Sequence, residues 1–367
     1  MDVWAEPRKA GRPVDVHVSP AQRRALVTFL EGQELQPQVF IEDLHSAVDA
    51  HVSSVRRRGG EDMNWNNYFR LEQIYKWMEA LQKSNPGVVS TVDIGKSNEG
   101  RVIKGIIIKF APGLPVAMIE SGIHAREWIG PASATFFVDK ILNSAESDVV
   151  RKYEWHIFPS VNPDGYVYTW DKDRNWRKTR SRNWFFYRGV DANRNWPFHW
   201  MEAGANRDPS SEIYGGPWAE SEPETRALRK YVDKLAARMH AYIGLHSYSQ
   251  LLMFPWGFTS QHAKTHDKMN DIATKAIAAV TGVAGTHYDF GNIADTIYPA
   301  SGNTIDYVYS KCVPYPFVFE LRDNGEYGFL LPPDQITEAA SEAWAGVRVI
   351  VEEALRAGVP AQNPPSC

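Results

Sequence analysis

Three residues at the ends of predicted strands could together hold a metal ion. His124 and Glu127, spaced as His-x-x-Glu, follow the apolar run PVAMIESG, and His246 lies at the end of a second run, HAYIGLHS. Strand ends are where an α/β sheet presents its ligands, because the carboxyl ends of its strands border one crevice. Two histidines and one glutamate with an open fourth position form a catalytic zinc set. The pattern therefore predicts a zinc ion that polarises a carbonyl group and activates water.

A lone His-x-x-Glu pair is weak support for this site. With 11 histidines in the chain, about one such pair is expected by chance. The chain contains a second pair, His199 and Glu202. It also contains His262 and His266 at helical spacing, but Ala263 stands where a helical zinc motif needs its glutamate. We expect both of these pairs to be ordinary surface residues.

Hydrolysis on zinc also requires a carboxylate that carries protons. Glu320, in the run YPFVFELRD, ends a third predicted strand directly after apolar residues. Burying an unpaired glutamate among apolar residues costs free energy, so this glutamate is expected to have either a function or a partner. It could act as the general base and then the general acid. The alternative is a structural ion pair with Arg322.

Arginine and asparagine recur among aromatic residues in two short motifs. The first, RNWR, ends at Arg177, and the second, DANRNW, contains Asn193 and Arg194. Arginine is suited to planar, bidentate capture of a carboxylate. The motifs therefore indicate an anion-binding patch, whereas the alternative is a solvated charged surface.

A sheet with flanking helices would bring these residues together. Strand-like runs lie at 88–94, 102–109, 115–121, 153–160, 240–247 and 315–321. Helical patterns lie near 69–81, 130–143, 263–280 and 334–356, and a capping box of Ser221 and Glu224 predicts another helix. Strands interleaved with helices predict an α/β fold, with a mixed and mostly buried sheet flanked by helices on both faces.

Residues 1–58 are predicted to form a small α+β unit before a catalytic unit at 59–367. The first unit has strand-like runs at 14–20 and 38–43 and helical patterns at 21–32 and 44–55. It begins without the apolar core of a signal peptide, so no export signal is expected in the chain as given. The joint, Arg56-Arg57-Arg58-Gly59-Gly60, is either a solvated linker or a cut site for a trypsin-like protease.

Composition excludes several classes of protein. A chain of 367 residues can fold around its own core. The net charge of −4 argues against nucleic acid or an anionic membrane as the partner, and no apolar run approaches about 18 residues. The two cysteines, Cys312 and Cys367, exclude a disulfide scaffold and a Cys-rich metal site. Two free thiols are the default expectation, and the alternative is a disulfide between Cys312 and Cys367.

Longer motifs resemble the pancreatic-type zinc metallocarboxypeptidases, near carboxypeptidase A. In order between residues 64 and 356 they are GIHAREWIGPA, NPDGYVYTW, RNWRKTR, GVDANRNW, GLHSYSQLLMFPWG, TIYPASGNTIDY and FELRDNGEYGFLLP. Residues 1–58 resemble the later part of that family's prosegment, whose start is expected to be missing. The resemblance implies a secreted, monomeric zymogen with one zinc ion per chain, activated by a trypsin-like protease. Because the prosegment is incomplete, only partial inhibition is expected.

The resemblance also implies roles for individual residues. His124, Glu127 and His246 would hold zinc, and Asp191 would orient His124. Glu320 would be the base and acid, and Arg177 would stabilise the oxyanion. The residues implied in substrate binding are Asn193, Arg194 and Tyr298 at the terminal carboxylate, Arg126, Tyr248 and Phe329 in the outer subsites, Ile305 in the side-chain pocket, and Ser247. The chain departs from the family's usual disulfide near 187–211, where it has Tyr187, Ser210 and Ser211, so the loops at 180–215 are expected to differ.

Together these features predict an exopeptidase that removes one residue at a time from peptides with a free C-terminal carboxylate. A preference for aromatic or large aliphatic residues is expected because Ile305 and its neighbours carry no charge. These neighbours are Met253, Gly257, Ile293, Ile297, Ala300 and Val318. The alternatives are a zinc amidase or deacylase that acts on small N-acyl amino acids, and a non-catalytic peptide-binding module with the same fold.

Overall fold

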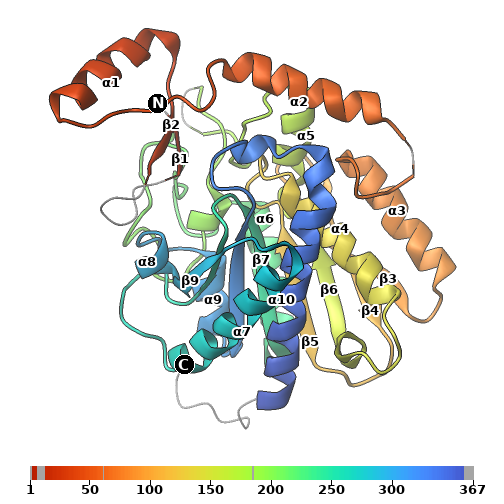
Figure 1. Ribbon diagram of the computed structural model, residues 1–367. Helices are drawn as coiled ribbons and strands as arrows, with labels where there is room; N and C mark the ends of the chain where they lie inside the picture. The colour runs from red at the N-terminus through yellow and green to blue at the C-terminus, as the bar shows by residue number, and fades with distance from the viewer. Residues whose placement is uncertain (1, 6–12, 61, 184–185, 359–367) are drawn as a thin grey trace.

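The computed structural model (Figure 1) describes residues 2–5, 13–60, 62–183 and 186–358. Within these residues, eight strands form one sheet in the order β3–β4–β6–β5–β7–β10–β8–β9. Their bounds are β3 (Val89–Lys96), β4 (Val102–Lys109), β5 (Val116–Ser121), β6 (Glu154–Phe158), β7 (Met239–Ser247), β8 (Leu251–Phe254), β9 (Asp289–Asn292) and β10 (Tyr315–Leu321). The central strands β6, β5, β7 and β10 are parallel, whereas β4 and β8 run antiparallel to β6 and β10. The predicted mixed sheet is confirmed.

Burial explains why the central strands were recognisable in the sequence. Every residue of β5 and β6 is buried, so these strands face the protein interior on both sides. All six predicted runs form strands. The sequence did not predict β8 and β9, which are only four residues long.

Helices cover both faces of the sheet. Ile243 and Leu245 of β7 pack in a large core with one set of helices: α3 (Leu71–Ser84), α4 (Ile129–Leu142), α7 (His266–Ala284) and α10 (Ile336–Ala357). Tyr242 points to the other face, because successive side chains of a strand alternate, and packs with α6 (Pro223–Leu235) and α9 (Thr304–Ser310). Two shorter helices are α5 (Pro163–Asp171) and α8 (Ile293–Thr296). None of the helices in the described residues is long and apolar enough to cross a membrane.

The predicted capping box at the start of α6 is wrong. Glu222 is the N-cap residue, and Pro223 is the first residue of the helix. Proline suits this position because its missing N–H would have no partner in the first turn. The hydroxyl group of Ser221 instead donates to Glu222 Oε1.

The N-terminal unit contains two short strands and two helices. β1 (Asp2–Ala5) and β2 (Asp15–His17) pair antiparallel, and α1 (Pro20–Gly32) and α2 (Leu44–Arg58) follow. Both predicted helices are confirmed, but the predicted strand at 38–43 is wrong. That run pairs with no strand in the described part of the chain, and Val39 and Phe40 are exposed. A strand without a neighbour leaves its backbone groups to water, so a bent segment forms instead.

The expectation of two free thiols is also wrong. Cys312, which follows α9, is disulfide-bonded, and the described residues contain no free cysteine. Cys367, the other cysteine of the chain, lies outside the described residues.

Candidate active site

The three predicted metal ligands meet where β5 and β7 end. His124 and Glu127 lie in the turn between β5 and α4, and His246 is the penultimate residue of β7. His124 Nδ1 lies 2.8 Å from Glu127 Oε1, and His246 Nδ1 lies 3.1 Å from both Glu127 Oε2 and His124 Nδ1. All three side chains are buried. Among the described residues, this is the group of three or more side chains that could hold a metal ion.

The donor set fits zinc. Tetrahedral zinc with bonds of about 2.0–2.1 Å places its ligand atoms about 3.3 Å apart, close to the three distances above. Glu127 Oε2 is buried and accepts no hydrogen bond in the described residues, which leaves it available to a cation. Burial opposes ionisation of Glu127, but the charges on His124 and His246 hold its pKa below the usual range. The glutamate is therefore a carboxylate at neutral pH, as a metal ligand must be.

Asp191 holds the outer side of this group. Its Oδ1 lies 3.1 Å from His124 Nε2, so Nδ1 of the same ring is left to face the metal position. Its Oδ2 accepts a 2.8 Å hydrogen bond from Arg177 Nη2. Burial opposes the charge of Asp191, but Arg177 and His124 keep its pKa well below the usual value. Such a partner fixes both the orientation and the tautomer of a ligating imidazole.

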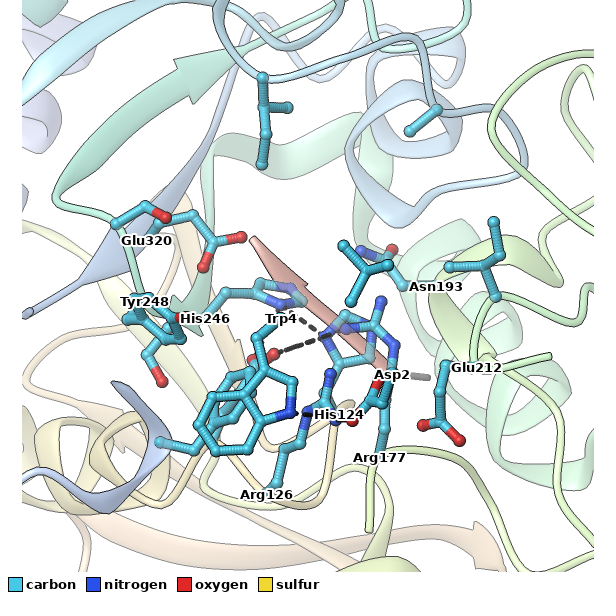
Figure 2. A pocket seen from close by; sticks show the side chains of 18 of the residues that line it. Asp2, Trp4, His124, Arg126, Arg177, Asn193, Glu212, His246, Tyr248 and Glu320 are labelled. Carbon is cyan, nitrogen blue, oxygen red and sulfur yellow. Dashed lines mark hydrogen bonds and ion pairs between the residues drawn. The ribbon is translucent and has the colours of Figure 1, made fainter. Parts of the chain in front are cut away.

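Glu320 lies beside His246 on the neighbouring strand. Strands β7 and β10 are parallel, and their register places Glu320 directly opposite His246. Figure 2 shows the carboxyl group of Glu320 directed toward His246. Arg322, the alternative partner considered from the sequence, contacts Glu338 and Glu342 of α10. The arrangement thus places a carboxyl group next to the metal ligands.

The residues predicted to form an anion-binding patch gather around Arg194. This residue ends a short 3-10 turn (Ala192–Arg194), and its side chain is almost fully buried. Its guanidinium group donates to Gly204 O, Asn193 O and the hydroxyl of Tyr298, at 2.7, 3.0 and 3.0 Å. Asn193 Oδ1 accepts from the backbone N–H of Thr304 at 3.0 Å. These bonds hold Arg194, Asn193 and Tyr298 in fixed positions around one point of the cavity.

Thirteen residues predicted to bind metal or substrate or to take part in catalysis line one cavity of about 530 Å³. They are His124, Glu127, His246, Glu320, Arg177, Asn193, Arg194, Tyr298, Arg126, Ile305, Ser247, Tyr248 and Phe329. The two other histidine pairs lie outside it. His199 hydrogen-bonds Glu202 at 2.6 Å and stacks on Phe258, and His262 stacks on His266.

One side of the cavity is a pocket with uncharged walls. The predicted wall residues that line it are Met253, Ile293, Ile297, Ala300, Ile305 and Val318. Gly257 was also predicted there but is not a lining residue, and its backbone N–H donates to Asp306 Oδ1 at 2.8 Å. Ser249 and Asn303 line the cavity without having been predicted.

Strands β1 and β2 of the N-terminal unit reach into the mouth of this cavity. Arg126 Nη1 donates to Asp2 Oδ2 at 2.9 Å, and the hydroxyl of Tyr248 donates to Asp15 Oδ2 at 2.7 Å. The indole ring of Trp4 packs edge-on against Phe329, with ring centroids 5.0 Å apart. Figure 2 shows Asp2 and Trp4 beside His124 and Arg126. The N-terminal unit thus contacts three of the residues implied in substrate binding.

Glu212 is a cavity residue that the sequence did not indicate. It belongs to a loop that the sequence marked only as departing from the family's disulfide pattern. Lys178 Nζ holds this loop by donating to Pro209 O and Ser211 O at 2.9 and 3.0 Å. Burial raises the pKa of Glu212, which lies near Arg126 and Asp2. Its neighbours Ser210, Ser211 and Ile213 also line the cavity.

A His–Glu–His group at the strand ends of a mixed α/β sheet, with a carboxylate and a buried arginine beside it, defines a metal-dependent hydrolase. The chain belongs to the zinc carboxypeptidase family, whose profile matches residues 74–346. The profile of the carboxypeptidase activation peptide matches residues 1–51. Zinc is therefore the cofactor, and the enzyme is a zymogen-type peptidase that removes residues from C-termini.

Individual relatives agree with this assignment. Zinc carboxypeptidase A 1 of Anopheles gambiae is 38% identical over 358 residues, which cover 96% of this chain and 83% of that protein. Carboxypeptidase B of Astacus astacus is 41% identical over 296 residues, which cover 78% of this chain and 97% of that protein. The crystal structure of carboxypeptidase A from Helicoverpa armigera superposes with a TM-score of 0.91 at 28% identity, covering 97% of this chain and 92% of that one. Because both A and B types are similar, similarity alone does not decide which C-terminal residue is removed.

Proposed function

We propose that this enzyme removes aromatic and large aliphatic residues from the C-termini of peptides. The observation that carries the proposal is the uncharged wall of the side-chain pocket, where Ile305, Met253 and Val318 face the cavity. A Lys or Arg side chain entering there would lose its water without gaining a counter-charge. Such burial costs several kcal/mol, and ~4 kcal/mol corresponds to a rate preference of ~10³-fold. A Phe or Leu side chain instead gains about 1.5–3 kcal/mol.

The residues around the cavity have complementary roles in this proposal. When zinc is bound by His124, Glu127 and His246, it supplies a Lewis acid that polarises the scissile carbonyl and makes water more acidic. The buried guanidinium of Arg194, with Asn193 and Tyr298, binds the substrate's terminal carboxylate. That contact requires a free chain end and so makes the enzyme an exopeptidase.

Proton transfer and charge stabilisation fall to two further residues. Glu320 removes a proton from the attacking water and later delivers it to the leaving amine. The guanidinium of Arg177, held by Asp191, lies 3.9 Å from Glu127 at its Nη1 and is available to the oxyanion. Arg126, Ser247, Tyr248 and Phe329 contact the residues that precede the scissile bond.

Replacing Ile305 by Asp is expected to shift the preference toward basic residues. The test compares kcat/KM for matched substrates that end in Phe, Leu, Lys and Glu, before and after the substitution. The wild type should favour Phe over Lys by about 10²- to 10³-fold, and Ile305→Asp should raise the Lys/Phe ratio by at least tenfold. Ile297→Leu, which changes the same wall without adding charge, is the control. Wild-type rates for Lys and Phe within tenfold of each other would contradict the assignment of the pocket.

We also propose that residues 1–58 are a prosegment that restricts access to the cavity. The contacts of Asp2, Trp4 and Asp15 with Arg126, Phe329 and Tyr248 support this role.

Native trypsin digestion should cut first at Arg56–Arg58. These residues are exposed at the end of α2, next to Gly59 and Gly60. We expect a stable fragment that begins near residues 57–64, with activity that rises severalfold once the prosegment is separated. Mass spectrometry of the fragments and a peptidase assay at each time point would measure both. First cleavage elsewhere, or activity unchanged by removal of the prosegment, would count against the proposal.

We further propose that the enzyme is secreted and monomeric. The match to a carboxypeptidase activation peptide supports secretion, because such a segment keeps a peptidase inactive until another protease removes it. Expression from the native gene, with assay of the medium and N-terminal sequencing of the product, tests export. Size-exclusion chromatography with light scattering tests the monomer. Retention inside the cells would contradict secretion, and a mass equal to two chains would contradict the monomeric state.

A further inference from the structure

Glu120 is a buried carboxyl group close to the zinc site that the mechanism above does not use. It lies in β5, and only about 1% of its surface is exposed. Neither of its carboxylate oxygens has a hydrogen-bond partner in the described part of the chain. A buried polar group without a partner costs free energy, so its presence calls for an explanation.

The register of the sheet places Glu120 in one row with the pocket wall. Glu120 of β5 lies opposite Gly244 of β7, which lies opposite Val318 of β10. Side chains at the same level of neighbouring strands point to the same face, and Val318 faces the cavity. Gly244 has no side chain, and a Cβ atom there would lie 3.2 Å from Glu120 Oε1. The carboxyl group therefore occupies the space that the glycine leaves open.

The next row of side chains on the same face contains a zinc ligand and the predicted general base. His246 and Glu320 lie opposite each other, two residues beyond Gly244 and Val318. Glu120 lies on the strand next to that of His246, one row of side chains away on the same face, and successive rows are about 7 Å apart along a strand. Charges inside a protein are screened less than charges in bulk water. Glu120 and a metal ion bound by His246 would therefore interact electrostatically.

We propose that Glu120 strengthens zinc binding, as a buried carboxylate one row below the ligand His246. Its negative charge offsets the two positive charges of the ion, and the ion in turn stabilises a carboxylate that has no other partner. This inference rests on the zinc site described above. Burial raises the pKa of Glu120 to about 7, and the charge on Glu127 acts in the same direction, whereas the charge on His246 lowers it. A cation bound at His246 would act in the same direction as that charge.

Zinc affinity, measured by competition with a chromogenic chelator, tests the proposal on the full chain. The variants are Glu120→Gln, which keeps the shape, and Glu120→Met, which fills the space with apolar atoms. Both should bind zinc about tenfold more weakly than the wild type. Glu224→Gln is the matched control, because Glu224 is similarly buried and also has an unpartnered oxygen but lies in α6, outside the sheet that carries His246. Its zinc affinity should be unchanged.

A second readout separates this role from a purely structural one. Replacing an unpartnered buried carboxyl by Met should leave the thermal stability of the zinc-free chain unchanged or higher. Lower zinc affinity in Glu120→Met at undiminished apo stability is therefore the expected combination, and it is measurable even where Glu120→Gln does not fold. Wild-type affinity in the folded Glu120 variants would overturn the proposal, as would an equal loss in Glu224→Gln. A wild-type chain that binds no zinc would instead overturn the zinc site itself.

Discussion

Glu320→Gln is expected to lower kcat by about 10²- to 10⁴-fold, because the amide cannot accept the proton of the attacking water. The substitution keeps the shape of the side chain, so zinc and substrate should still bind. Steady-state kinetics on a blocked dipeptide measure the loss of proton transfer. Zinc content and the inhibition constant of a substrate analogue show whether zinc and substrate still bind. We expect a fall in kcat with KM and zinc content close to the wild type.

Glu224→Gln serves here too as a control, since it removes a buried carboxylate outside the cavity. Retention of more than a tenth of the wild-type kcat in Glu320→Gln would assign the base to another group. Loss of folding would indicate a structural role like the one first considered for a pair with Arg322.

Arg194→Ala is expected to lower kcat/KM by about 10²- to 10³-fold on peptides with a free C-terminus. The buried guanidinium group is held at the cavity by its hydrogen bonds to Gly204, Asn193 and Tyr298. Its loss would leave the substrate carboxylate without a charged partner. Kinetics with paired substrates, one a peptide acid and one its amide, measure the effect.

The acid/amide pair also supplies the internal control for Arg194→Ala. The variant should lose most of its activity on the peptide acid but little of the low activity on the amide. The ratio of kcat/KM for the acid to that for the amide should therefore fall. Arg207→Ala removes a guanidinium that lies over Trp200 and outside the cavity lining, and it should leave the ratio unchanged. Equal losses on acid and amide in Arg194→Ala would show that the residue only supports the fold.

The sequence predicted the centre of the fold better than its margins. Strands β5 and β7 are mostly apolar, and nearly all their residues are buried on both faces of the sheet. The hydrophobic pattern alone therefore identifies them. Strands β8 and β9 have four residues each and take their order from pairing with β10 and with each other. The run at 38–43 has the composition of a strand, but a strand also needs a partner, and composition does not supply one.

The metal and anion sites were predictable where residue type and spacing coincide with a strand end. His124, His246 and Glu320 each follow an apolar run, and the longer motifs named the residues around them. Contacts between distant segments were not predictable in this way. Glu120 was hidden because it lies inside an apolar strand, and only the register with Gly244 places it beside the zinc ligands. The contacts of Asp2 and Asp15 join residues more than 120 positions apart.

The central claim is that the cavity joins zinc chemistry to recognition of a free C-terminus. The most direct measurement incubates the trypsin-activated enzyme with a Phe-terminated peptide and with its C-terminal amide, each with and without a zinc chelator, and follows the products by mass spectrometry. The acid should lose one residue at a time, the amide should react at least about 100-fold more slowly, and the chelator should abolish both reactions until zinc is restored. Equal hydrolysis of acid and amide, internal fragments as first products, or activity that survives complete removal of zinc would contradict the account.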